Sequence, residues 1–403
     1  MIKYLLAILC LTFFSCGENK QTPEIQSNKE PVGKINEDES NNNNFEFENN
    51  NENHKLFSLG DYFTHNDTLG KIVDNIFNRM NDGDKVAQMI ITSTGNYGKS
   101  PDHIINLIKN RKIGGVVFLG GSIDKFRGLI KDFTNTARKN NSLPLIFSTD
   151  AEPSLINIKI SGLESFRPTN TIKTLSQSKQ TAMEISEILK SIGFQQNFAP
   201  VCDNNINREI IGNRSFGSNL EDIEQLASRF IEETQSENII ATAKHFPGHG
   251  NVKGDSHKSL VYIDGELKEL DVYENLIQNK NLLAIPISIM VGHIAIRNNK
   301  DGFDTDNYPA TLSRKIVTVL LKQQMNYTGI VITDGMNMGA LNSFSRPSFL
   351  AVKAGCDMIL MPSDEEQLYT SILTEYKENK EFQDQINESV KKIIRAKVCL
   401  GMM

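Results

Sequence analysis

The feature of this sequence that most constrains its fold is an alternation between short apolar runs and longer segments with helical periodicity. The apolar runs are the expected strands, which span residues 86–92, 113–120, 143–150, 194–200, 239–246, 287–294, 329–335 and 358–362. The expected helices span residues 124–138, 175–191, 219–234, 312–325, 364–377 and 384–400. Eight strands with intervening helices predict an α/β fold, a (β/α)8 barrel of the TIM type forming a single catalytic domain. An open doubly wound sheet is the alternative.

Polar side chains stand at the ends of four of these apolar runs. They are Asp150 in "LIFSTD", Lys244 and His245 in "IIATAKH", His293 in "IMVGH" and Asp334 in "IVITD". A buried strand tolerates such groups only where they have partners or a function. Because the active site of a barrel lies at the C-terminal ends of its strands, we expect these side chains to surround one pocket.

The loop at residues 244–257 reads "KHFPGHGNVKGDSH" and holds three of the seven histidines of the chain. A metal site is disfavoured, because the proline and glycines around His245 and His249 oppose the helix that would place both on one face. In an extended segment Asp255 and His257 lie on the same face, so that the carboxylate can orient the imidazole. We expect a mobile acid/base here, with a purely structural loop as the alternative. Such a base opposite Asp334 fits a two-step displacement.

Together these motifs resemble the β-N-acetylglucosaminidase branch of glycoside hydrolase family 3. The resemblance also rests on "NFAPVCDNN" (197–205), "IGNRSFG" (211–217), "MVGHI" (290–294), "PATLS" (309–313), "GIVITDGMNMGA" (329–340) and "AGCDMILMP" (354–362), which follow the order and spacing of the family. It covers most of residues 80–400. The "DSH" triplet separates this branch from the β-glucosidases of the same family.

The resemblance implies a role for each matching residue. Asp334 matches the catalytic nucleophile, His257 the general acid/base and Asp255 its partner. The positions that match the binding of sugar hydroxyls are Asp150, Arg214, Lys244 and His245. It further implies a retaining, exo-acting enzyme that needs no cofactor or metal and removes terminal β-linked N-acetylglucosamine, with peptidoglycan fragments as the natural substrate.

One stretch departs from the family pattern. The family reads D-Q-E-G-G-R-V-x-R or D-x-E-W-G after the third strand, whereas this chain reads "DAEPSLINIKI" at 150–160. Ile158 stands where the family has a second substrate-binding arginine, and Lys159 and Arg167 are the candidates to replace it. The chain has no tryptophan, so stacking on a sugar falls to phenylalanine or tyrosine. The alternatives are a β-glucosidase or other family 3 hexosidase, and a catalytically degenerate sugar-binding lipoprotein.

The N-terminus, "MIKYLLAILCLTFFSC", has an apolar run from Tyr4 to Phe14 that is too short to span a bilayer but suits a signal peptide. Its end resembles a bacterial lipoprotein cleavage site, which implies lipidation of Cys16. The protein is then expected to be exported and anchored through lipid to a bacterial membrane, on its periplasmic or cell-surface face. A cleaved, secreted form and an uncleaved anchor are the alternatives.

The expected division of the chain is a lipoprotein-type signal peptide at 1–16, a disordered asparagine-rich linker at 17–57 and the barrel at 58–403. The formal net charge is −6 and no long basic run occurs, which argues against a nucleic-acid partner. We expect a monomer whose partners are its carbohydrate substrate and, through the lipid, a membrane.

Overall fold

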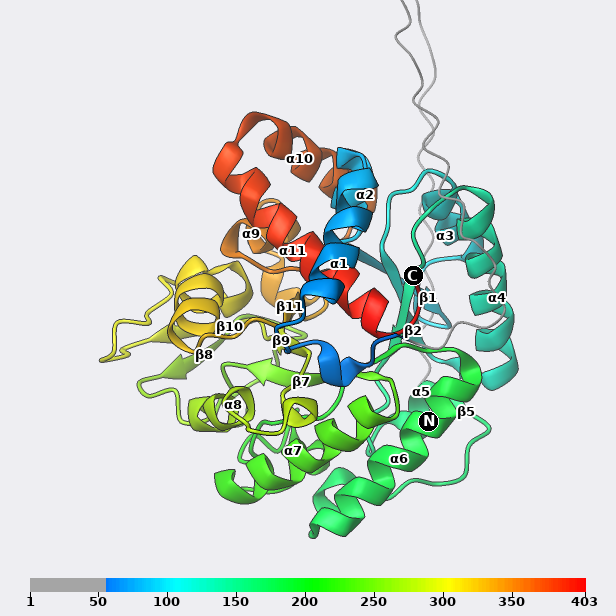
Figure 1. The fold of residues 1–403 in the computed structure, drawn as a ribbon. Coiled ribbons are helices and arrows are strands. Elements are labelled where there is room, and N and C mark those ends of the chain that lie inside the picture. The colour runs from blue at the N-terminus through cyan, green and yellow to red at the C-terminus, as the bar shows by residue number, and fades with distance from the viewer. Residues whose placement is uncertain (1–55) are drawn as a thin grey trace, which may run out of the picture. The chain divides into compact units, whose positions relative to one another are not determined.

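A computed structural model describes residues 56–403, which form a barrel of strands with helices around it (Figure 1). The predicted signal peptide, Cys16 and nearly all of the predicted linker lie outside the described residues. Within the described part of the chain, no helix is both long and apolar enough to cross a membrane.

Eight parallel strands form the barrel. In spatial order they are β1 (Ile90–Gly95), β2 (Gly115–Leu119), β4 (Ile146–Thr149), β6 (Gln196–Asn197), β7 (Ile240–Phe246), β9 (Ser288–Val291), β11 (Ile330–Thr333) and β12 (Ile359–Leu360). The pair Ile90–Ile359 joins β1 to β12, and a parallel bridge between Ile332 and Met358 brings β11 to the same strand. The predicted (β/α)8 barrel is confirmed, and the open-sheet alternative is wrong.

Helices surround the barrel. They are α1 (Asp67–Arg79), α2 (Asp82–Ala87), α3 (Pro101–Lys109), α4 (Ile123–Lys139), α5 (Ile156–Lys159), α6 (Leu175–Ile192), α7 (Leu220–Ser236), α8 (Leu270–Ile277), the π-type helix η6 (Lys315–Gln324), α9 (Pro347–Ala354), α10 (Glu365–Glu378) and α11 (Lys380–Cys399). Short 3-10 turns are η1 (Leu59–Asp61), η2 (Thr169–Thr171), η3 (Gly212–Arg214), η4 (Leu282–Ala284), η5 (Ala310–Leu312) and η7 (Gly339–Leu341). All six predicted helices are present, with ends shifted by a few residues.

Local sequence signals explain where a typical helix begins and ends. The Thr174 hydroxyl accepts a hydrogen bond from the Gln177 backbone N–H at the start of α6. The same helix ends at Gly193, whose positive φ of 108° suits glycine. Helix α7 likewise begins at the Asn219 side chain, which accepts from the Asp222 N–H. The predicted boundaries of these helices were therefore close.

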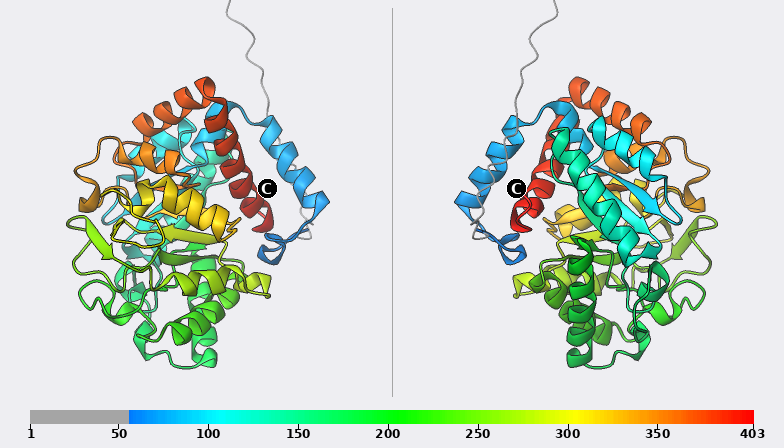
Figure 2. Two further views of the ribbon diagram at one scale, coloured as in Figure 1. Left: turned by 90° about the vertical axis from the view of Figure 1, so that its left-hand side faces the viewer. Right: turned by 90° about the vertical axis from the view of Figure 1, so that its right-hand side faces the viewer.

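The predicted strand at 86–92 begins too early. The Asn81 side chain accepts a hydrogen bond from the Asp84 N–H and starts α2, so that Val86 is a buried helical residue and β1 begins at Ile90. An apolar run alone does not separate the end of a buried helix from the start of a buried strand. Helix α1, before α2, packs against α11 from the opposite end of the described chain (Figure 2).

The predicted strand at 287–294 is interrupted. It ends in β9 at Val291, and Ile294 begins β10 (Ile294–Arg297), which pairs in parallel with β8 (Val261–Asp264) in a separate small sheet. A second small sheet joins β3 (Gly121–Ser122) to β5 (Ile160–Ser161). His293 lies in the break between β9 and β10, at the rim of the barrel.

Aromatic packing fixes one side of the barrel rim. The Phe118 ring of β2 lies 5.1 Å from Phe126 and 6.3 Å from Phe133, both on α4, measured between ring centroids. The first pair has the edge-to-face geometry that aromatic rings prefer. The packing between strand and helix thus holds the end of β2 in place, and Leu119 at that end lines the pocket described next.

Candidate active site

A pocket of about 430 Å³ lies at the C-terminal ends of the barrel strands. Six of the seven predicted catalytic and binding residues line it, namely Asp150, Arg214, Lys244, His245, His257 and Asp334. The seventh, Asp255, contacts His257. The structure therefore brings the predicted site together in one place, although the roles assigned to its members stay predictions.

Asp334 immediately follows β11. Its backbone N–H donates to the Val291 carbonyl of β9, and its Oδ1 accepts from the Gly335 N–H at 2.8 Å. Burial acts to raise the pKa of this carboxyl, but the interactions with His245, His293, the Gly335 N–H and Lys244 outweigh it and lower the pKa to about 2. Asp334 is therefore an anion at neutral pH, as a carboxylate nucleophile must be.

The sequence predicted that His293 would line the pocket, but it does not. It instead contacts the backbone of Gly335, the residue after Asp334. Its Nε2 lies 2.9 Å from the Gly335 carbonyl, which only accepts, so Nε2 carries the hydrogen. Its Nδ1 then accepts from the Thr311 hydroxyl at 2.8 Å. Burial lowers the pKa of His293, which keeps it neutral. We infer that these two hydrogen bonds allow His293 to orient the segment that carries Asp334.

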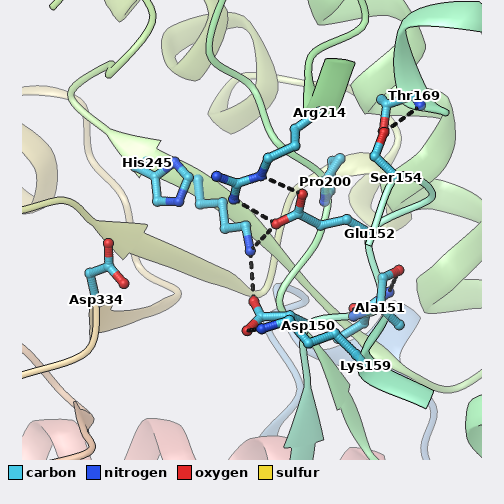
Figure 3. Close-up of polar contacts among 12 residues, drawn as sticks. Asp150, Ala151, Glu152, Ser154, Lys159, Thr169, Pro200, Arg214, His245 and Asp334 are labelled. Carbon is cyan, nitrogen blue, oxygen red and sulfur yellow. Dashed lines mark hydrogen bonds and ion pairs between the residues drawn. The ribbon is translucent and has the colours of Figure 1, made fainter. Parts of the chain in front are cut away.

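A buried ion-pair cluster forms the opposite wall (Figure 3). The Lys244 Nζ lies 2.8 Å from Asp150 Oδ1 and 2.6 Å from Glu152 Oε1. Arg214 donates from Nε and Nη2 to the two oxygens of Glu152 at 2.8 and 2.7 Å. Burial acts to raise the pKa of Glu152, yet Arg214 and Lys244 hold it far below its usual range. Each buried charge in the cluster thus has a partner of opposite sign.

Glu152 is a site residue that the sequence analysis missed. The signal was present, because the stretch "DAE" keeps the D-x-E of the family pattern directly after a strand end. Its geometry also changes the prediction for Arg214, whose guanidinium is engaged by Glu152 and, through Nη1, by the Ile210 carbonyl at 3.2 Å. Arg214 lines the pocket with only its remaining N–H groups available for a ligand.

The structure distinguishes the two candidates for the missing arginine. Ile158 is 69% exposed and does not line the pocket. The next residue, Lys159, does line it, and its Nζ lies 3.6 Å from Asp150 Oδ2. Arg167 instead lines a separate surface hollow beside α6. Of the two, Lys159 is the cation that reaches the pocket.

His245 is anchored from below by a second residue that the sequence analysis missed, Asp203. The Asp203 Oδ2 lies 2.6 Å from His245 Nδ1, and the carboxylate also accepts from the His245 backbone N–H. The charge of His245 holds the pKa of Asp203 low, although burial opposes it. The Lys244–His245 peptide bond is cis. Because Asp203 ends "APVCD", a polar residue after an apolar run was again the available signal.

Asp255 and His257 form the predicted pair at the tip of the loop. The Asp255 Oδ1 lies 2.9 Å from His257 Nδ1 and accepts from the His257 backbone N–H at the same distance. Because a carboxylate only accepts, Nδ1 carries a hydrogen and Nε2 is the ring nitrogen left for a substrate. The His257 side chain is 60% exposed. Burial acts to raise the pKa of Asp255, but its bonds to His257 lower it.

Backbone contacts with η7 hold this tip over the pocket. The Gly339 N–H donates to the His257 carbonyl at 2.9 Å, and the Ala340 N–H donates to the Ser256 carbonyl at 3.2 Å. A Cβ at Gly339 would lie 2.6 Å from the Lys258 carbonyl oxygen, so that only glycine permits the approach.

Among residues 56–403, no three His, Cys, Asp or Glu side chains are placed to share a metal ion.

A parallel barrel with an anionic carboxylate and a histidine–carboxylate pair at one rim has the fold and functional groups of a glycoside hydrolase. The family model described as "Glycosyl hydrolase family 3 N terminal domain" matches residues 83–396 of this chain. The chain therefore belongs to glycosyl hydrolase family 3. The predicted family, and with it the prediction of a glycoside hydrolase, is confirmed.

Relatives with known names agree with this placement. The chain is 29% identical over 274 residues to a beta-hexosaminidase of Photobacterium profundum, covering 64% of this chain and 78% of the relative. It is 25% identical over 277 residues to a beta-hexosaminidase of Haemophilus influenzae, covering 65% and 76%. A solved family 3 beta-N-acetylglucosaminidase from Paenibacillus sp. superposes with a TM-score of 0.72 at 24% identity, covering 80% of this chain and 63% of that one. The last likeness shows the fold, and this chain spans somewhat less than two thirds of that protein.

The ion-pair cluster yields a first prediction. The change Glu152→Gln removes the charge shared by Arg214 and Lys244 and leaves both cations under-compensated. Hydrogen bonds to charged groups contribute about 1.5–3 kcal/mol each, so we expect kcat/KM to fall roughly tenfold to a hundredfold and the melting temperature to fall with it. Steady-state kinetics on the best aryl β-glycoside and thermal unfolding measure both effects.

The matched control is Glu184→Gln, at an exposed position on α6. It should leave both kinetics and melting temperature unchanged. If Glu152→Gln behaved like this control, the cluster would not be what holds Arg214 and Lys244 in the pocket.

Proposed function

We propose that this protein is an exo-acting β-N-acetylglucosaminidase that removes terminal β-linked N-acetylglucosamine with retention of configuration. The observation that carries the proposal is the placement of an anionic Asp334 and the Asp255–His257 pair on one 430 Å³ pocket. The names of the relatives support the sugar, and the "DSH" triplet supports the branch. We further propose peptidoglycan fragments as the natural substrate, on the resemblance to this branch.

In the first step, the Asp334 carboxylate attacks the anomeric carbon and the glycosidic C–O bond breaks. His257, protonated on both nitrogens, donates its Nε2 hydrogen to the departing oxygen, while Asp255 stabilises the imidazolium through Nδ1. In the second step, neutral Nε2 removes a proton from water, whose oxygen attacks the anomeric carbon and releases Asp334. Two displacements give retention. Because the acid/base is neutral when deprotonated, it adds no second anion beside Asp334 and does not raise its pKa.

The sugar itself would be held by the charged wall. Asp150, Lys244 and Lys159 present a carboxylate and two ammonium groups to the pocket, and these match alternating hydroxyl donors and acceptors on a pyranose. Among residues 56–403, Tyr97 is the one tyrosine or phenylalanine that lines the pocket, and its side chain is largely exposed. It is the aromatic surface available for stacking in a chain without tryptophan.

A panel of aryl β-glycosides tests the sugar and the nucleophile together. We expect the N-acetylglucosaminide to be hydrolysed fastest, ahead of the N-acetylgalactosaminide, glucoside and xyloside. Asp334→Ala should abolish turnover of every substrate, because no leaving group replaces a missing nucleophile. Asp301→Ala, at an exposed position, is the control.

Other outcomes point elsewhere. A preference for the glucoside would make the protein a β-glucosidase, and binding of sugar without turnover by the wild type would make it a degenerate binder. Full activity of a folded Asp334→Ala variant would remove Asp334 from the mechanism.

A second prediction separates nucleophile from acid/base. His257→Ala should cripple hydrolysis of natural disaccharides, whose alkoxide leaving group needs a proton, while sparing the first step for a dinitrophenyl leaving group. The variant should then accumulate the glycosyl-enzyme, because the water of the second step has lost its base. Mass spectrometry would detect the adduct on the peptide that contains Asp334. Equal losses for good and poor leaving groups, with no adduct, would contradict the role of His257.

We also propose that the protein is exported and anchored through a lipid on Cys16, in keeping with the sequence "FFSC". Cys16→Ala should then move the protein from the membrane fraction to a soluble pool or leave it as a precursor. Fractionation and labelling with a fatty acid measure this, with Cys10→Ala as the matched control. Unchanged membrane association and no label on the wild type would refute the proposal.

A further inference from the structure

We propose that His249 is a positioning residue that holds the Asp255–His257 pair over the pocket by binding Ser256. The proposal rests on the proposed role of His257 as acid/base. His249 is the second of the three histidines in the loop at 244–257, and it neither lines the pocket nor takes part in the proposed displacement mechanism. Its side chain contacts Ser256 near the tip of the loop, and its backbone contacts Asp203 at the base.

The central contact joins two buried side chains. His249 is 2% exposed and Ser256 is similarly buried, and His249 Nε2 lies 3.0 Å from Ser256 Oγ. Ser256 stands between Asp255 and His257 in the chain. A bond that fixes Ser256 therefore fixes the backbone on which both members of the pair are carried.

The neighbouring Asn207 determines which nitrogen of His249 carries the hydrogen. Asn207 Oδ1 accepts from the backbone N–H groups of Glu209 and Ile210, so its Nδ2 is the atom that faces His249 Nδ1 at 3.4 Å and the Gly254 carbonyl at 3.3 Å. Because Nδ2 donates, Nδ1 accepts, and Nε2–H donates to the Ser256 hydroxyl. Burial lowers the pKa of His249 and keeps it neutral. Both ring nitrogens are thus occupied by structural bonds, which makes a holding role the chemistry open to it.

The other end of His249 is fixed to the floor of the pocket. Its backbone N–H donates at 2.7 Å to Asp203 Oδ1, while Oδ2 of the same carboxylate binds His245 Nδ1. The connection therefore runs without a break from His245, which lines the pocket, through Asp203 and His249 to Ser256. The buried Asp203 carboxylate fixes the base of the loop, and the buried His249 imidazole links that base to Ser256 near the tip.

Glu269 fixes the middle of the loop through hydrogen bonds to the backbone. Its two oxygens accept from the backbone N–H groups of Asn204 and Gly250 at 2.6 and 3.0 Å. A Cβ at Gly250 would lie 2.3 Å from the Asn204 carbonyl oxygen, so glycine is required for this close approach. The exposed His257 ring at the tip has no such packing of its own, and its position depends on the anchors at Ser256 and η7.

Two substitutions of similar polarity test the proposal. The Gln side chain of His249→Gln places its terminal amide near the former Nε2 and can still donate to Ser256, whereas the shorter Asn of His249→Asn reaches only the former Nδ1 position. For a disaccharide or alkyl leaving group we expect His249→Asn to lower kcat roughly tenfold to a hundredfold with little change in KM. His249→Gln should keep most of the wild-type kcat for the same leaving groups. With a dinitrophenyl substrate, His249→Asn should slow the first step far less.

Ser256→Ala provides an independent variant that removes one oxygen and keeps the histidine. It should reproduce the loss of His249→Asn, and the double variant should be no worse than either single one, because both remove the same bond. Additive losses, or equal losses on good and poor leaving groups in folded variants, would mean a general structural role and overturn the proposal.

His257→Ala, assayed beside them, separates the two hypotheses. If His257→Ala shows no dependence on the leaving group, the proposed mechanism fails. If His257→Ala shows that dependence but His249→Asn and Ser256→Ala match the wild type, the mechanism stands and the positioning role of His249 is wrong.

Discussion

The closure of the parallel barrel is the constraint on which the rest of the structure depends. Once β12 pairs with β1 and meets β11, the carboxyl ends of all eight strands face one rim. Residues that are far apart in sequence, such as Asp150 after β4 and Asp334 after β11, then line a single pocket. The barrel strands are buried and carry only uncharged polar residues, such as Thr92 and Ser148, among their apolar ones, while the charged residues stand at or near their ends, where partners from neighbouring strands can reach them.

The pocket solves a charge problem that its own composition creates. Three carboxylates, Asp150, Glu152 and Asp334, lie near Lys244 and Arg214 in a setting where an unpaired charge is costly. Glu152 binds both cations, which lowers its own pKa, and Asp334 has no direct ion pair within the described part of the chain. Asp334 remains anionic through the field of more distant groups and one backbone N–H. A carboxylate charged in this way is free to react, whereas one locked in a salt bridge is not.

Much of this could be predicted from the sequence, for physical reasons that also mark the limit. The barrel strands lie within largely apolar runs, so all eight were found, and polar residues at their ends identified the pocket. The D-x-E pattern was an available signal for Glu152, but its pairing with Arg214 joins residues 62 positions apart, and no local pattern encodes that pairing. The role of His293 was misplaced because only the break between β9 and β10 turns it toward Gly335. Likewise the apolar residues Val86 and Ala87 would suit a helix or a strand, and the Asn81 cap places them in helix α2.

The density of histidine and glycine in the loop at 244–257 follows from its need to join a rigid floor to an exposed tip. His245 binds Asp203 at the floor of the pocket, His249 binds Ser256 in the interior of the loop, and His257 is exposed at the tip. The three rings therefore lie in order from the base of the loop to its tip. A Cβ at Gly248 would lie 2.3 Å from Glu269 Oε2, and a Cβ at Gly250 would lie 2.4 Å from Glu269 Oε1 and 2.3 Å from the Asn204 carbonyl oxygen. These glycines therefore allow close packing at the base of the loop. In this arrangement His249 and Ser256, which are buried and neutral, connect the Asp203 carboxylate to the proposed acid/base without adding a further charge beside Asp334.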